Sequence, residues 1–441
     1  MTSILIESPP VTQLNSPVIK RLSSGLTIVA EQMPIEAVNL SLWLRVGSVV
    51  ESDAINGMAH YLEHMVFKGT PNIKCGEFER LIEERGAVTN AATSQDYTQY
   101  YITTAPQDFK DLAPLQIELV MNPTIPDEAF ERERPIILEE IRRSEDNPRR
   151  RTFHRSMEMA FERLPYRRPV LGPASVIEQL TAQQMRDFHT RWYRPASITA
   201  VAVGNLPVDS LVEIVADGFR RAEENRCQAW GLSPNCDGEG ALHSTLPIPE
   251  PPFQSISRID YVDKTLQQAR LVMSWRVPGM IDLSQTYALD ILASILGRGR
   301  TARLIRDLRE ERRLVNSLSI SNMTYGHQGV FYITAQLPVE QLAEVEAAIA
   351  DHVNRLCTEP VTELELRRIR NQVANRYIFG NETPSDRAGL YGYYQAITGD
   401  LAHAINYPSH IQSLQAADLQ AAAQRYLSPT AYGVMTVRPE G

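Results

Sequence analysis

The chain is poor in the residues that most often build metal and disulfide frameworks. Its four cysteines, Cys75, Cys227, Cys236 and Cys357, are scattered over 441 residues and form no C-x-x-C pair. This spacing argues against a cysteine zinc site and gives no sign of a disulfide framework, so it is compatible with a reducing compartment. Histidine is also scarce, with nine residues, so two histidines close together in the sequence stand out.

Long apolar runs and an excess of positive charge are also missing. No apolar segment is long enough to span a membrane, and the start of the chain lacks the basic and apolar regions of a secretory signal, which predicts a cytoplasmic protein. The 44 Lys and Arg residues are outnumbered by 53 Asp and Glu residues, for a net charge of -9, so no nucleic-acid partner is expected. We interpret the arginine-rich stretch 142–151, interrupted by Glu145 and Asp146, as a solvated helix end.

Two histidines flank a glutamate in His60-Tyr61-Leu62-Glu63-His64. Residues four apart on an α-helix share a face, so His60 and His64 can bind one cation. The flanking sequence predicts a helix that begins after Asn56-Gly57 and ends at Lys68-Gly69-Thr70-Pro71. Imidazole suits Zn²⁺, and the H-x-x-E-H order is the inverted form of the zinc-peptidase motif. Glu63 is therefore placed to act on a water molecule beside the metal.

A catalytic zinc site needs a third protein ligand. The long helix predicted from Pro126 offers several carboxylates, namely Glu128, Glu131, Glu133, Glu139 and Glu140. Glu133 and Glu140 are two helical turns apart and share one face. Spacing alone does not choose among these residues, because the packing of two helices depends on the tertiary structure.

The remaining elements alternate between strands and helices. Strands are expected within 18–51, at 88–93, 97–103 and 198–203, and helices at 75–85, 108–121, 174–193 and 209–220. Residues 172–195 align without a gap to residues 406–429, and an apolar strand follows each segment. A proline-rich segment separates the two halves. The sequence thus predicts an α+β fold with two homologous α/β-sandwich domains, 1–232 and 254–441, joined by a linker at 233–253.

The two halves differ at the metal motif. In the alignment of the halves, Leu62 corresponds to Leu292, so Asp290, Ala293 and Ser294 stand in the second half where the first has His60, Glu63 and His64. We therefore expect the second half to hold no metal and to be structural or to bind substrate.

The segment His60 to Thr70, HYLEHMVFKGT, resembles the signature of the pitrilysin/insulinase family of zinc peptidases, which includes the mitochondrial processing peptidase and short bacterial members. The resemblance extends over essentially the whole chain. It implies that Glu140, within Ile136–Ile141, is the third ligand, and that Glu133 supports the site from outside the ligand set.

The resemblance also implies residues that contact substrate. Asn90, Ala91, Ala92 and Thr93 match an edge strand that pairs with the backbone of the substrate. Arg387 and Tyr394 match an Arg/Tyr pair that reaches the scissile bond across the cleft and stabilises the oxyanion, although Tyr391 or Tyr393 could be the relevant ring instead.

The implied function is a zinc endopeptidase with one Zn²⁺ per chain that hydrolyses peptides or unfolded, targeting-type segments in an enclosed chamber. Relatives build that chamber from four such domains, so this chain is expected to be half of a clamshell and to form a homodimer or a heterodimer with a related subunit. Two alternatives are a non-catalytic scaffold or partner subunit of a peptidase-like complex, and a metal-dependent hydrolase of another bond.

Overall fold

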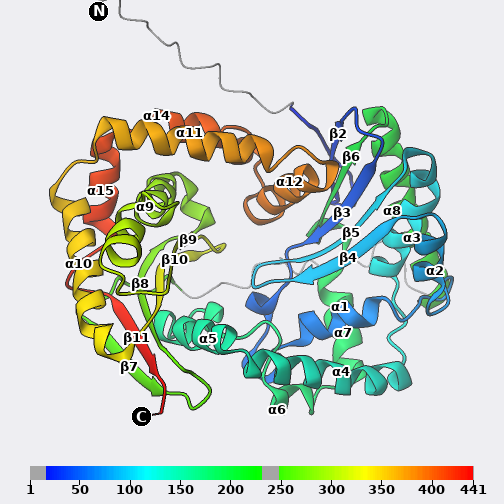
Figure 1. Ribbon diagram of the computed structural model, residues 1–441. Coiled ribbons are helices and arrows are strands. Elements are labelled where there is room, and N and C mark those ends of the chain that lie inside the picture. The colour runs from blue at the N-terminus through cyan, green and yellow to red at the C-terminus, as the bar shows by residue number, and fades with distance from the viewer. Residues whose placement is uncertain (1–15, 231–247, 441) are drawn as a thin grey trace, which may run out of the picture.

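A computed structural model describes residues 16–230 and 248–440 of the chain. Most of the predicted linker at 233–253 lies outside the described residues. The fold is α+β, as predicted: two mixed sheets flanked by helices face each other around the centre of the molecule, in the manner of half a clamshell (Figure 1).

The first sheet has six strands in the order β1-β2-β6-β3-β5-β4. All pairs are antiparallel except β2 with β6. Strand β4 is last in the order, so it lies at one edge of the sheet and pairs only with β5. The strands are β1 (Val18–Arg21), β2 (Thr27–Gln32), β3 (Val38–Leu44), β4 (Val88–Thr93), β5 (Thr98–Thr104) and β6 (Ile198–Gly204).

The second sheet repeats this arrangement without the first strand. Its order β7-β11-β8-β10-β9 corresponds to β2-β6-β3-β5-β4, and its single parallel pair, β7 with β11, corresponds to β2 with β6. The strands are β7 (Ser257–Val262), β8 (Ala269–Pro278), β9 (Ser317–Met323), β10 (Gln328–Leu337) and β11 (Gly433–Arg438). The matching order supports the internal duplication that the alignment of the two halves predicts.

Helices of the first half other than α5 lie on the side of the first sheet that holds its core. The helices of this half are α1 (Met58–Val66), α2 (Glu77–Glu84), α3 (Phe109–Met121), α4 (Asp127–Asp146), α5 (Pro148–Ala160), α6 (Ala174–Ile177), α7 (Ala182–Trp192) and α8 (Val208–Trp230). The single helix expected at 174–193 is wrong. It is two helices, because Thr181 and Gln184 form a capping box that starts α7 anew.

Helices of the second half pack on the second sheet in a similar way. A π-helical segment lies at Ile305–Glu311. Its helices are α9 (Tyr287–Gly297), α10 (Leu342–Thr358), α11 (Glu363–Phe379), α12 (Pro384–Thr398), α13 (Ala402–Ile405), α14 (Tyr407–Ser413) and α15 (Ala416–Tyr426).

One helix of each half packs on the sheet of the other half. Helix α12 lies against β3 and β6 of the first sheet, and α5 lies against β8 and β11 of the second (Figure 1). The contact of α12 is so close that a Cβ at Gly392 would lie 2.0 Å from Nε1 of Trp43. Each exchanged helix buries its own apolar cluster, so the two halves share two cores besides their own.

Candidate metal centre

The motif helix α1 starts at a carboxylate from a neighbouring loop. Gly57, at φ +99°, precedes the helix, and Glu51 accepts hydrogen bonds from the backbone N–H groups of Gly57 (2.9 Å) and Ala59 (2.7 Å) and from Nδ2 of Asn56 (2.8 Å). Burial raises the pKa of Glu51 to about 7, although these hydrogen bonds favour the charged form. Glu51 thus caps the helix that carries both histidines, one turn before His60.

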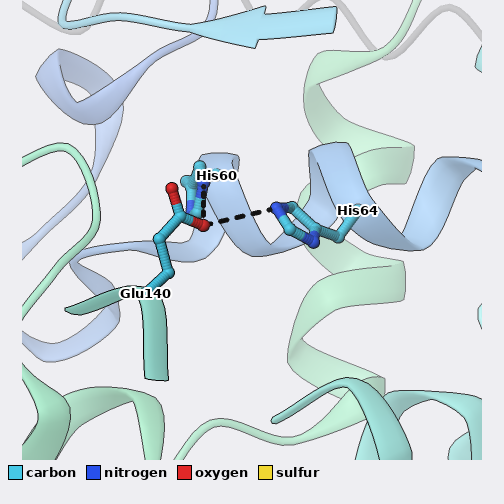
Figure 2. Close-up of side chains that lie close together, drawn as sticks. All are labelled: His60, His64 and Glu140. Carbon is cyan, nitrogen blue, oxygen red and sulfur yellow. Dashed lines mark ion pairs between the residues drawn. The ribbon is translucent and has the colours of Figure 1, made fainter. Parts of the chain in front are cut away.

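His60 and His64 face each other across one turn of α1, and Glu140 of α4 lies between them (Figure 2). Nε2 of His60 is 3.4 Å and Nε2 of His64 is 3.7 Å from Oε2 of Glu140. The ligand atoms of the three residues all lie within 4.8 Å of one another. Two imidazoles and a carboxylate at these separations are a donor set of the kind that catalytic zinc uses.

The protonation state of His60 suits a metal ligand. Burial, with a smaller contribution from the charge of His64, lowers the pKa of His60 to about 3, so its ring is neutral at pH 7. Neutral imidazole is the form that ligates metals. The Nδ1 atom of His60 is buried and has no hydrogen-bond partner among the described residues.

Glu133 orients the second histidine. Its Oε1 is 3.0 Å from Nδ1 of His64, and its Oε2 is 2.6 Å from Nζ of Lys68. Burial acts to raise the pKa of Glu133, but the hydrogen bonds from Lys68 and His64 outweigh it and hold the pKa below its usual range. An ionised Glu133 accepts a hydrogen bond from the Nδ1–H group of His64. The Nε2 lone pair of His64 is then directed toward Glu140.

The other acids of α4 are engaged elsewhere. Glu131 pairs with Arg134, Glu139 pairs with Arg142 and Arg143, and Glu128 lies near Arg132. The tertiary structure therefore selects Glu140 from the carboxylates that sequence spacing left open.

Glu63 lies next to the ligands and is held by the edge strand. The hydroxyl of Thr93 donates a hydrogen bond to Oε2 of Glu63. Burial raises the pKa of Glu63, while the bond from Thr93 and the charge of His64 act in the opposite direction. A half-buried carboxylate with a raised pKa accepts a proton more readily than an exposed one.

A cavity of about 730 Å³ opens on this group. His60, Glu63 and Glu140 line it together with Ala92 and Thr93 of β4, and residues of α5 form another part of its wall. Asn90 and Ala91 lie on the same edge strand, further along from Thr93. Candidate metal ligands and the edge strand of the first sheet thus line one cavity.

Within one chain, Arg387 and Tyr394 lie away from this group, so their expected role at the scissile bond stays a prediction for the facing half of a partner subunit. Arg387 of α12 is buried, and its Nη1 is 2.8 Å from Oε1 of Glu31 on β2. Tyr391 donates to the same carboxylate, at 2.8 Å. The guanidinium therefore joins the two halves, and neither Arg387 nor Tyr394 lines the cavity.

The alternative rings do not reach the ligands either. Tyr393 donates to the backbone carbonyl of Thr324 (3.2 Å), and Tyr394 packs edge-on against Tyr393 with ring centroids 5.7 Å apart.

Sequence reasoning missed Glu51 and Lys68 as supporting residues. Their proximity to the motif was visible, but no local pattern marked either side chain as aimed at it.

No helix in the part of the chain that the structure describes is both long enough and apolar enough to cross a bilayer.

Comparison with known proteins shows the family of the chain. Residues 27–174 match the family described as "Insulinase (Peptidase family M16)", and residues 179–373 match "Peptidase M16 inactive domain". The second match begins before the end of the first sheet, so the domain boundary at 232/254 stays a prediction.

Relatives and a solved structure match along almost the whole chain. An uncharacterized zinc protease of Mycobacterium tuberculosis is 26% identical over 95% of this chain and 92% of its own length. The zinc protease PqqE of Helicobacter pylori is 27% identical over 95% of this chain and 92% of its own.

The crystal structure of a protease from Helicobacter pylori has a TM-score of 0.88 and 25% identity, and covers 96% of this chain and 99% of its own. With both family matches in chain order and relatives that span the same length, the chain belongs to the insulinase family, peptidase family M16, which is the pitrilysin/insulinase family that its metal motif resembles.

Proposed function

We propose that this chain is a zinc-dependent endopeptidase, with one Zn²⁺ held by His60, His64 and Glu140. The observation that carries the proposal is the convergence of these three donors beside a cavity that His60, Glu140 and Glu63 line. When bound, zinc supplies Lewis acidity, which activates a water molecule and polarises a peptide carbonyl. The relatives named zinc proteases support this choice of metal.

Glu63 is the general base in this proposal. Its carboxylate accepts a proton from the attacking water and delivers it to the amine of the leaving peptide. The hydroxyl of Thr93 fixes the carboxylate by its hydrogen bond to Oε2. The raised pKa of Glu63 favours the first transfer, because burial makes the protonated carboxyl less costly than the charged carboxylate.

The edge strand binds the substrate backbone in this proposal. Asn90, Ala91, Ala92 and Thr93 belong to β4, whose outer edge has no neighbouring strand among the described residues. An extended peptide can add to such an edge through main-chain hydrogen bonds, which demand little of its side chains. This favours peptides and unfolded or targeting-type segments as substrates over folded proteins.

A partner subunit completes the chamber. The chain is half of a clamshell, and the cavity beside the ligands is open on one side, so we propose a homodimer or a heterodimer with a related chain. Since neither Arg387 nor Tyr394 lines the cavity of its own chain, the Arg/Tyr pair that stabilises the oxyanion comes from the facing subunit in this proposal. Sedimentation of the purified chain, with cleavage measured in parallel, separates the two kinds of dimer. A cytoplasmic location remains part of the proposal.

A non-catalytic scaffold or partner subunit is the second candidate. It is favoured by the description "inactive domain" for the family matched by residues 179–373. The first half opposes it, since both histidines, Glu140 and Glu63 are all present. Zinc content and cleavage of an unstructured peptide distinguish the two candidates.

The direct test of the proposal is Glu63→Gln. We expect the variant to retain zinc and to lose cleavage by roughly a thousandfold, within the range for removal of a general base. Glu83→Gln, on the exposed face of α2, is the matched control and should cleave at the parental rate. Parental turnover by the Glu63 variant would show that another group is the base.

A further inference from the structure

The arginine-rich segment 142–151 divides into two kinds of residue. Arg142 and Arg143 pair with Glu139, and Arg151 pairs with Asp263. Arg149 and Arg150 are exposed, and neither side chain has an ion-pair partner in the described part of the chain. The interpretation as a solvated helix end therefore holds for the paired arginines only.

Both unpaired arginines line the cavity that His60 and Glu140 also line. They lie in the first turn of α5, whose N-cap Asn147 accepts from their backbone N–H groups at 2.9 and 3.3 Å. Positive side chains are unfavourable there, because the N-terminus of a helix already carries a partial positive charge. No acidic residue of α5 occupies that turn to offset them.

A second cavity extends this positive region. About 340 Å³ in volume, it is lined by Arg149 and Arg270 together with hydroxyl-bearing side chains of β9 and β10. Burial lowers the pKa of Arg270, and the charges of Arg149 and Arg151 lower it further. The Nε atom of Arg270 is buried and has no partner among the described residues. Arg149 belongs to both cavities and connects the metal site to this pocket.

The acids near the arginines do not neutralise them. Glu63 and Glu140 face the cavity from α1 and α4, but both belong to the proposed metal and base group. Glu145 is exposed at the rim and forms no ion pair with a described residue. His154, also on the wall, pairs with Glu158 at 3.4 Å. The wall formed by α5 thus carries a net positive charge in a chain whose total charge is negative.

We propose that Arg149 and Arg150 bind an acidic side chain of the substrate, so that the site prefers peptides with Asp or Glu near the scissile bond. The inference rests on the proposed function and names its substrate class. Guanidinium groups bind carboxylates through charge-assisted hydrogen bonds, and the partly enclosed cavity reduces their screening by solvent. Phe153 and Met157, on the same wall, accommodate an apolar neighbour of that side chain.

The test measures binding separately from cleavage. Zinc-loaded Glu63→Gln protein is titrated into labelled peptides that share one neutral sequence and carry Glu or Gln at each position around the scissile bond. At one or two positions we expect Glu peptides to bind roughly two- to fivefold more tightly than Gln peptides, the range for exposed ion pairs. Arg149→Glu with Arg150→Glu should abolish this preference and favour Lys at the same position.

The control is a second double charge reversal, Arg221→Glu with Arg367→Glu, which makes the same change in net charge at exposed positions outside both cavities. It should keep the preference for Glu. Equal binding of Glu and Gln peptides at every position, or an equal loss in both double variants, overturns the inference. Cleavage by the parental protein is measured on the same peptides. If the protein cleaves them but binds Glu and Gln peptides equally, only the acidic subsite is refuted. If it binds Glu peptides more tightly but cleaves none, only the peptidase proposal is refuted.

Discussion

Helices α1 and α9 occupy corresponding places on two sheets of the same strand order, yet their polar residues differ in what they bind. In α1, Nε2 of His60 and Nε2 of His64 both face Oε2 of Glu140, at 3.4 and 3.7 Å. In α9, Oδ1 of Asp290 accepts from Asn322 at 2.8 Å and Oδ2 accepts from Tyr407 at 3.1 Å. A polar group satisfied within the fold is structural, whereas converging lone pairs leave room for a ligand.

The same comparison extends to the exchanged helices. Helix α12 brings Arg387 to the first sheet, where it is neutralised by Glu31. Helix α5 brings Arg149 and Arg150 to the cavity, where they remain unpaired. Both exchanged helices join the two halves, but only that of the first half also contributes to the wall of the site. The predictions below are ways to break this difference.

The largest effect is expected from Arg387→Met. Removing one partner leaves the carboxylate of Glu31 buried and uncompensated, so the free energy of unfolding should fall by about 3–5 kcal/mol. Chemical denaturation measures this, with exposed Arg367→Met of α11 as the control. Replacing Glu31 and Arg387 together by Met should recover most of the loss. A change below about 1 kcal/mol in the single variant would show that the ion pair does not join the halves.

Asp290→Asn tests whether the buried Asp290 of α9, which accepts hydrogen bonds from Asn322 and Tyr407, binds a proton in the folded state. Burial raises the pKa of Asp290 from 3.8 to about 6, so the folded state binds this proton more tightly than the unfolded state. For the parental protein, the free energy of unfolding therefore decreases as the pH rises from about 4 to about 6. In the variant this decrease should be smaller by about 2–3 kcal/mol. An unchanged pH dependence would contradict the buried, proton-binding state of Asp290.

Glu133→Gln tests the support of the proposed metal site. Without the carboxylate, Nδ1 of His64 loses the acceptor that orients the ring, and zinc affinity should fall by roughly 10- to 100-fold. Competition with a chelator measures the affinity. Glu128→Gln, on the exposed face of the same helix, is the control and should bind zinc as the parental protein does. Equal affinities for the two variants would remove Glu133 from the site.

The smallest effect is expected from Thr93→Val. The hydroxyl of Thr93 lowers the pKa of Glu63, so its loss should raise that pKa. Because Glu63 acts as a base only when ionised, the acid limb of the kcat/KM profile should move to higher pH, with a loss of roughly fivefold near neutral pH. Thr89→Val, whose hydroxyl instead bonds the carbonyl of Tyr101, should leave the limb in place.

The parts of the structure that follow local patterns could be predicted from the sequence. The H-x-x-E-H spacing places His60 and His64 on one helical turn, and the alignment of the halves predicts two sheets of one design. Glu140 needed the family resemblance, because the choice among the carboxylates of α4 depends on how α1 and α4 pack.

The parts that depend on exchange between the halves could not be predicted. Nothing local in α12 shows that it covers the first sheet, so the burial of Arg387 against Glu31 was unforeseen. The same holds for α5, whose arginines look like any solvated charged helix until the cavity on their side is known. Long-range packing decided both outcomes, and local propensity carries no information about it.

The central claim, that α1 holds a metal where α9 cannot, is tested most directly by zinc content. Elemental analysis of the zinc-loaded, dialysed protein should give one zinc per chain. A variant in which α1 carries the residues of α9, His60→Asp with Glu63→Ala and His64→Ser, should give none while remaining folded. A parental protein without bound zinc, or a variant that binds as much zinc as the parental protein, would contradict the account.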